Sequence, residues 1–181
     1  ALRRDCLPGV QPIRVDVKTV EEIDTLFDGA IVYAKGGRMI VMLMHAMGEE
    51  NFFKGITDYF NKHQYSNTVA DDLWEALTPY AGFNVKEFMT PWLIQPGYPV
   101  VSSSGEQYRF LLTPGDEPQY QYPISNLLDD LSGHYLIKLT DNELSEKLAN
   151  INTLSKEQKL RLLIDRKLLA KTDAVESVSL L

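Results

Sequence analysis

Cysteine is nearly absent from this chain, since Cys6 is the only one among its 181 residues. No disulfide bond can therefore form within the chain, and such low cysteine usage is typical of a reducing compartment. Long apolar runs are also missing, because no stretch approaches the ~20 residues of a membrane-spanning helix. We therefore expect a cytoplasmic protein that does not contact a membrane. The chain begins at Ala1 rather than at methionine, so the lack of a visible signal peptide decides nothing.

Positive charge is in short supply. Lysine and arginine number 18 against 25 aspartate and glutamate residues, which leaves a net charge of −7 at pH 7. Binding to nucleic acid depends on clustered basic side chains, so an acidic chain of this kind is a poor nucleic-acid binder. Hydrophobic residues make up 44% of the sequence, which is enough for a packed core and argues against disorder.

Metal-binding and phosphate-binding motifs are absent from the sequence. The three histidines are His45, His63 and His134, and none has a second histidine four residues away as in the zinc motif H-E-x-x-H. The glycines do not form the G-x-x-x-x-G-K-S/T loop of nucleotide-binding proteins. Cys6 has no histidine near it in the sequence that could activate it as a nucleophile. The residues themselves predict no metal ligands and no bound cofactor in this chain.

Helical periodicity follows an irregular first segment. Residues 31–47 are apolar on nearly all sides, which predicts a buried helix that ends at Gly48. A second helix is predicted over residues 49–63. Two more helices are predicted to begin at the N-caps Thr68 and Asn84. Helices joined by such brief connections are typical of an all-α unit.

Backbone breakers mark a change at residues 95–99, where two prolines and a glycine prevent a helix from continuing. Beyond them, residues 100–102, 107–112 and 134–139 predict the strands of a small β unit. A helical pattern returns at Ser155, and another helix is predicted from Asp173 onward. The predicted apolar stripe of the helix after Ser155 consists of Leu160, Leu163, Ile164 and Leu168.

Tyr33 is the least ordinary polar residue, because it opens a helix next to Gly36 and Gly37. Glycine is costly within a helix, so these positions predict that backbone or substrate packs very close to them. A tyrosine in this place can make a structural hydrogen bond at an interface, or it can point its hydroxyl out of the helix. The residues alone favour the structural role and leave the second open.

Several strings of residues together carry a family resemblance. Residues 27–37 read F-D-G-A-I-V-Y-A-K-G-G and are followed by M-G-E-E-N-F at 47–52. Residues 73–74 read L-W, and residues 92–101 read W-L-I-Q-P-G-Y-P-V-V. In order and separation these strings resemble the F-D…Y-x-K-G…G-E-E and L-W…W…Q-x-G-Y-P-V segments of the M1 family of zinc aminopeptidases. One departure is Gly37, where the family often has alanine.

The resemblance implies a multi-domain α+β fold. Residues 1–98 would form the all-α lobe of a thermolysin-like catalytic domain. Residues 99–153 would form a small β-sandwich domain, and residues 154–181 would begin the C-terminal helical domain. The chain would thus combine the end of a catalytic domain with the modules that follow it.

The resemblance also implies a function. The chain would be a fragment of a zinc metalloaminopeptidase, which removes N-terminal amino acids from peptides. Zinc would belong to the parent protein, with its ligands before Ala1 and none in this chain. Tyr33 would be the one catalytic residue here, donating a hydrogen bond to the oxyanion on the side away from the zinc. The fragment alone would be inactive, and no oligomeric state follows from the sequence.

A different class of function stays open beside this one. The chain could instead be a non-catalytic scaffold or protein-interaction module made of a helical lobe and a β unit. The motif H-E-x-x-H in the parent protein distinguishes the two, because only the enzyme needs it.

Overall fold

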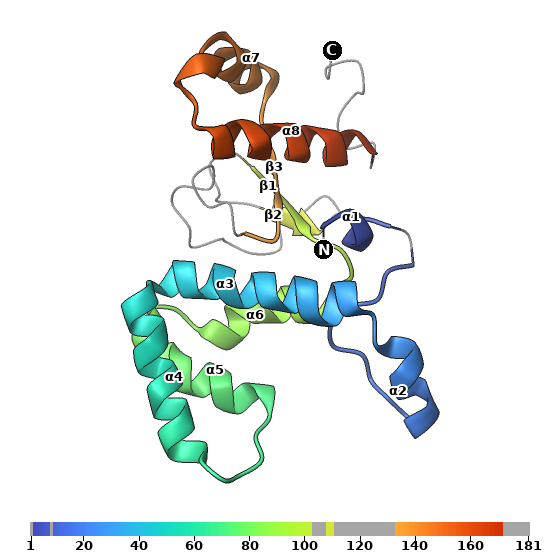
Figure 1. Ribbon diagram of the computed structural model, residues 1–181, viewed down its shortest axis with the longest axis vertical. Helices are drawn as coiled ribbons and strands as arrows, with labels where there is room; N and C mark the ends of the chain where they lie inside the picture. Colours follow the sequence, from blue (N-terminus) through green and yellow to red (C-terminus); the bar gives the residue numbers. More distant parts are fainter. Residues whose placement is uncertain (1, 8, 103–107, 111–132, 172–181) are drawn as a thin grey trace.

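The computed structural model describes residues 2–7, 9–102, 108–110 and 133–171, and these are mostly helical with one small sheet (Figure 1). The helices are α1 (Leu2–Asp5), α2 (Val20–Leu26), the π-helix η1 (Ala30–Lys35), α3 (Gly36–Met47), α4 (Glu49–His63), α5 (Ala70–Ala81), α6 (Val85–Ile94), α7 (Asp141–Ala149), the 3-10 turn η2 (Ile151–Thr153) and α8 (Lys156–Lys171). The strands are β1 (Pro99–Ser102), β2 (Tyr108–Phe110) and β3 (Leu136–Lys138). Within these ranges no helix is both long and apolar enough to cross a bilayer.

Two predicted helix starts, at Asn84 and Ser155, are confirmed by their caps. The side-chain oxygen of Asn84 accepts a hydrogen bond from the Glu87 amide at 3.1 Å, so α6 begins where expected. At α8, Ser155 Oγ accepts from the Gln158 amide at 3.1 Å, and the Gln158 side chain accepts from the Ser155 amide at 3.0 Å. This reciprocal pair is a complete capping box. The helix predicted over residues 49–63 is α4.

The predicted N-cap of α5, Thr68, is wrong by one residue. Val69 is the N-cap, and the Asp72 carboxylate accepts a hydrogen bond from its amide at 2.8 Å. The Thr68 hydroxyl is instead bonded to the Tyr59 hydroxyl at 2.7 Å. Asp72 at the third position of the helix thus satisfies the amide of the cap residue, which is the half of a capping box that does not depend on the side chain of the cap residue.

The three strands form a sheet in the order β2-β1-β3, with β1 antiparallel to β2 and parallel to β3. Strands β2 and β3 lie within the predicted segments 107–112 and 134–139, and β1 begins one residue before the predicted segment 100–102. Helix α6 ends at Ile94, before the predicted break at residues 95–99. Gly97 has a φ of 79°, which glycine adopts without steric cost, so the break is fixed by the backbone itself.

Helix α7 is not predicted from the sequence, although its start carries a readable signal. Thr140 Oγ1 accepts from the Glu143 amide at 3.3 Å, and the Glu143 carboxylate accepts from the Thr140 amide at 2.7 Å. This Thr-x-x-Glu spacing is a capping box, and it places a helix inside the range 99–153 that we assign to a β unit. The short helix α1 is also not predicted. The helix expected from Asp173 lies outside the described residues.

The predicted apolar stripe of α8 is buried only in part. Leu168 is buried, but the other members are exposed to 58% at Leu160, 68% at Leu163 and 36% at Ile164. The buried positions of α8 include Arg161 and Asp165, which form an ion pair at 2.8 Å. Arg161 donates to the Tyr135 carbonyl at 2.8 Å, and Asp165 accepts from the Ile137 amide at 3.1 Å. Charges paired in this way can be buried, so they share the inward face of α8 with Leu162, Leu168 and Leu169.

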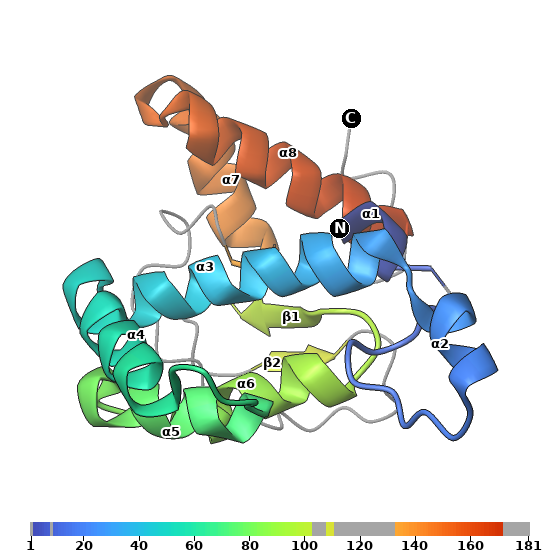
Figure 2. The same cartoon turned by 60° about the horizontal axis from the view of Figure 1, so that its bottom comes forward.

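The sheet is buried on both faces. Val101 and Ile137 pack in the main core with helix residues such as Met39 and Trp92. The adjacent strand positions point to a second cluster, formed by Cys6, Tyr98, Val100, Leu136, Leu168 and Leu169. Figure 1 shows the sheet between α8 and the pair of α3 and α6, and Figure 2 shows α1 beside the start of α3. The helical region and the strands therefore share one core.

Glycines in α3 and α4 have opposite surroundings. A Cβ added at Gly36 or Gly37 would meet no atom of the described residues within 4 Å, so no backbone in the described part of the chain makes the expected close approach. A Cβ added at Gly55 would lie 2.8 Å from Leu77 Cδ2 and 3.2 Å from the Ala76 carbonyl oxygen. Helices α4 and α5 thus approach closely because Gly55 has no side chain.

Alanine substitutions at these two sites are expected to change stability in opposite directions. Gly37→Ala should raise the free energy of unfolding by ~0.5–1 kcal/mol, because alanine favours the helix and the space is open. Gly55→Ala makes the same helix gain but overpacks α4 against α5, so it should lower that free energy by ~1–2 kcal/mol. Urea unfolding of the chain, followed by circular dichroism, measures both. A similar change at the two sites would contradict the close approach of α4 and α5.

Candidate functional site

Tyr33 lies on the π-helix η1, directly before α3. The Gly36 amide donates to the Ile31 carbonyl, which is the five-residue spacing of a π-helix. The Tyr33 side chain is 65% exposed, and the neighbouring Ala34 and Gly37 are exposed as well. Single-turn π-helices occur frequently at functional sites. This one exposes a phenol ring next to the small residues Ala34 and Gly37.

Asp28 builds the start of the π-helix. Its Oδ1 accepts a hydrogen bond from the Ala30 amide at 2.9 Å, and its carbonyl accepts from the amides of Ile31 at 3.0 Å and Val32 at 2.8 Å. Arg4 Nε donates to Asp28 Oδ2 at 3.0 Å. The bond from Ala30, and after it the bond from Arg4, lower the pKa of the Asp28 carboxyl below its ordinary value. The carboxylate therefore stays ionised at neutral pH and caps the first turn.

The Phe27 ring meets the Tyr33 ring edge-on. The ring centroids are 5.5 Å apart, and the ring planes are inclined at 78°. This is a favoured arrangement of two aromatic rings, because the positive edge of one faces the negative face of the other. Phe27 thus restricts the orientation of the Tyr33 ring, while both rings remain largely exposed.

Lys35 attaches the same turn to the rest of the chain. Its side chain is fully buried, whereas Tyr33 is exposed, so the two residues project from opposite sides of the turn. Lys35 Nζ donates to the Gly97 carbonyl at 2.7 Å, and it lies 3.1 Å from Asp5 Oδ2 and 3.5 Å from the Gln95 carbonyl. Burial lowers the pKa of Lys35, and the Asp5 charge opposes that shift. The π-helix is thereby joined to the loop after α6.

Asp5 extends this network to the segment before β3. The carboxylate is fully buried, accepts from the Gly97 amide at 3.2 Å and lies 2.7 Å from His134 Nε2. Burial lowers the pKa of His134 to about 4, against the effect of Asp5. His134 Nδ1 is buried without a partner among the described residues. Both observations fit a neutral imidazole that donates its Nε2–H to Asp5.

The histidines do not come together as metal ligands. His45 is exposed on α3, His63 ends α4, and His134 is bonded to Asp5. In the part of the chain that the structure describes, no group of three His, Cys, Asp or Glu side chains could hold a metal ion. A catalytic zinc ion requires three protein ligands, so these residues do not fit one.

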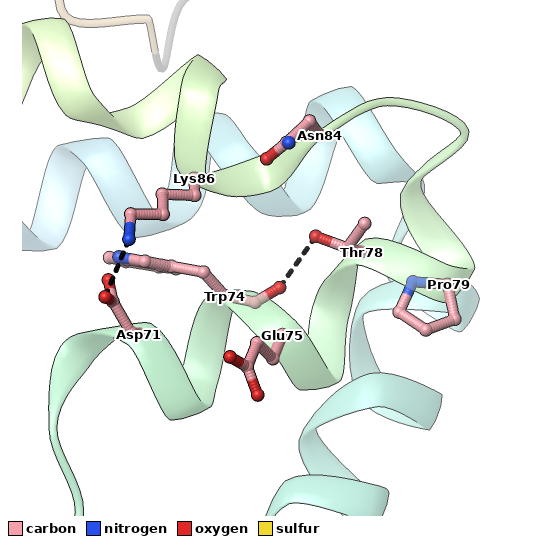
Figure 3. A pocket seen from close by; sticks show the side chains of 7 residues that line it. All are labelled: Asp71, Trp74, Glu75, Thr78, Pro79, Asn84 and Lys86. Carbon is pink, nitrogen blue, oxygen red and sulfur yellow. Dashed lines mark hydrogen bonds and ion pairs between the residues drawn. The ribbon is translucent and has the colours of Figure 1, made fainter.

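A hollow of about 310 Å³ lies at α5 and the start of α6 (Figure 3). It is lined by Asp71, Trp74, Glu75, Thr78, Pro79, Asn84 and Lys86. Most of its polar groups are engaged within the hollow, since Lys86 pairs with Asp71 at 2.7 Å and Thr78 Oγ1 donates to the Trp74 carbonyl at 2.8 Å. Tyr33 is not part of the lining. The hollow therefore adds no group to the Tyr33 site.

Sequence reasoning singles out Tyr33 but misses the buried network behind it. Lys35 carries one signal, because a lysine within a largely apolar helix must pair with a charge if it is buried. Asp5 carries none, since nothing in the sequence relates it to Lys35, Gly97 or His134. Only the folded chain brings these four residues together.

Comparison with known proteins supports a peptidase. A sequence model described as the peptidase family M1 domain matches residues 1–92. The chain is 37% identical to aminopeptidase N of Lactococcus lactis subsp. lactis (strain IL1403), over 97% of this chain and 26% of that protein. It is 50% identical to aminopeptidase N of Lactobacillus delbrueckii subsp. lactis, over 62% of this chain and 13% of that protein. It is 37% identical to tricorn protease-interacting factor F2 of Thermoplasma acidophilum, over 86% of this chain and 20% of that protein.

The range matched by the family model includes the whole π-helix with Tyr33. The chain belongs to peptidase family M1. The resemblance inferred from the sequence is thus confirmed. The chain spans 26% of the length of the Lactococcus aminopeptidase N sequences that it matches.

Proposed function

We propose that this chain is part of a zinc aminopeptidase that removes N-terminal amino acids from peptides, and that Tyr33 stabilises its transition state. The observation that carries the proposal is the exposed Tyr33 side chain on a π-helix whose first turn and ring orientation are fixed by Asp28 and Phe27. Membership in peptidase family M1 and relatives named aminopeptidase N support it.

The chemistry required of Tyr33 is the donation of one hydrogen bond. Negative charge develops on the carbonyl oxygen of a peptide as the carbonyl carbon is attacked, and a donor placed ~3 Å from that oxygen stabilises the charge. A phenol hydroxyl is a neutral donor at the end of a rigid ring, so it needs little reorganisation when the charge appears. The exposed Ala34 and Gly37 beside the ring leave room for a peptide to approach.

The wider organisation is part of the same proposal. Residues 1–98 would complete a catalytic domain, residues 99–153 a small β-sandwich domain, and residues 154–181 the start of a helical domain. Zinc would be held by residues of the parent protein outside this chain. A cytoplasmic location is supported by the single cysteine, which is buried and unpaired.

The isolated chain is expected to hydrolyse no aminoacyl-anilide and to retain no zinc after dialysis, because no three-ligand site is found among the residues that the structure describes. Absorbance assays and metal analysis measure the two properties, with the full-length parent protein tested in parallel. The parent should show both hydrolysis and bound zinc. One tightly held zinc per isolated chain, or turnover at the parent's rate that survives repurification, would contradict the proposal. A parent without hydrolysis would favour the scaffold alternative.

A further inference from the structure

We infer that Lys35 is a positioning residue, which fixes the orientation of Tyr33 by attaching the π-helix to the loop after α6. The inference rests on the proposed function of Tyr33 and concerns a side chain that is buried away from the exposed face of the turn. Lys35 follows Tyr33 by two residues in the same turn. A rotation of the turn about its axis would therefore move the ammonium and the phenol together.

The environment of the ammonium resists such a rotation. Three acceptors surround Nζ, which has three N–H donors: the Gly97 carbonyl at 2.7 Å, Asp5 Oδ2 at 3.1 Å and the Gln95 carbonyl at 3.5 Å. The loop that supplies two of them is itself held, because the Gly97 amide donates to Asp5 at 3.2 Å. Lys35 thus meets acceptors whose own positions are fixed.

The contacts at the start of the π-helix are weaker restraints. Arg4 pairs with Asp28 there, but the Arg4 side chain is 53% exposed. Exposed ion pairs are screened by water and contribute little to holding a geometry. Lys35 and Ile31 are the buried residues of η1. Of these two, Lys35 has the polar side chain, and its hydrogen bonds can fix the rotation of the turn about its axis.

Stability alone does not account for a lysine at this position. A buried ion pair replaced by apolar side chains of similar volume often leaves a protein equally stable. Burial of the Lys35 ammonium is unfavourable, as the direction of its pKa shift shows. What an apolar side chain could not supply is the set of hydrogen bonds to the Gly97 and Gln95 carbonyls, which orient the turn.

The test uses two variants of the full-length parent enzyme, Lys35→Met and the double variant Asp5→Asn with Lys35→Met. The double variant removes both charges, so no buried carboxylate is left unpaired if the single variant fails to fold. Turnover per folded molecule should fall by about 10-fold with KM little changed, because the donor is misplaced by a fraction of an ångström. The matched control is Arg161→Met with Asp165→Asn, a similarly buried ion pair that bonds to the backbone of residues 135 and 137. Its kcat per folded molecule should equal that of the wild type.

A Tyr33→Phe background separates this inference from the proposed function. If Lys35 acts through the Tyr33 hydroxyl, Lys35→Met should lower kcat about 10-fold in the wild type and less than about 2-fold in Tyr33→Phe. An equal loss of kcat in both backgrounds overturns the positioning role of Lys35 and leaves the proposed role of Tyr33 unaffected. So does a normal kcat for both lysine variants while Tyr33→Phe is impaired. A Tyr33→Phe enzyme with normal kcat overturns the proposed function, and the inference with it.

Discussion

Replacing Tyr33 with phenylalanine in the full-length parent enzyme is expected to lower kcat by ~10²–10³-fold, which corresponds to ~3–4 kcal/mol. The substitution removes one hydrogen-bond donor to the developing oxyanion and keeps the ring. KM should change little, because the lost interaction belongs to the transition state and not to the bound substrate. Steady-state kinetics with an aminoacyl-anilide measure both constants.

The structure makes this substitution interpretable. Tyr33 is 65% exposed, and its edge-on contact with Phe27 involves the ring and not the hydroxyl. The melting temperature and the metal content of the variant should therefore match the wild type. The reverse pattern would show that Tyr33 is structural: a stability loss of ~1 kcal/mol from a missing hydrogen bond, with normal turnover per folded molecule.

Asp165→Ala is expected to destabilise the chain by ~3–5 kcal/mol, because it removes the carboxylate that balances the buried guanidinium charge of Arg161. Arg161 and Asp165 are 5% and 3% exposed, and their charged atoms are 2.8 Å apart. Burial raises the pKa of Asp165 to about 6, and Arg161 opposes this shift. Removal of the carboxylate also leaves the Ile137 amide without its acceptor. Urea unfolding at pH 7.5, where Asp165 is ionised, measures the loss.

Glu50→Ala is the matched control for this variant. Glu50 and Lys54 also form an ion pair across four helical residues, at 2.7 Å, but their side chains are 83% and 53% exposed. The stability should hardly change, since exposed pairs of this kind contribute little. If Asp165→Ala were as mild as Glu50→Ala, the buried pair would not be what holds α8 against β3.

Local signals predict much of the fold, because caps and breakers act within a few residues of one another. Asn84 and Ser155 start helices where expected, and the prolines and Gly97 end α6. Thr140 starts α7 by the same chemistry, so its Thr-x-x-Glu spacing is the local signal for this helix. Errors at such positions stay small, as the shift from Thr68 to Val69 shows.

Contacts between distant segments could not be predicted in this way. The face of α8 depends on Arg161 and Asp165 meeting the backbone of residues 135 and 137, so leucine spacing alone assigns too many positions to the core. Asp5 is joined to Lys35 only through the fold. Tyr33 itself was identified through its motif, and the structure adds the π-helix and the contacts that build it.

The most direct test of the account is the affinity of the parent enzyme for a tetrahedral phosphinic peptide analogue. Such a compound resembles the transition state, so its affinity should depend on the same hydrogen bond as catalysis. We expect its Ki to rise in Tyr33→Phe by about the factor, ~10²–10³, by which kcat/KM falls, while binding of a ground-state amino acid product is unchanged. An analogue that binds Tyr33→Phe as tightly as the wild type would contradict the assignment of Tyr33 to the transition state.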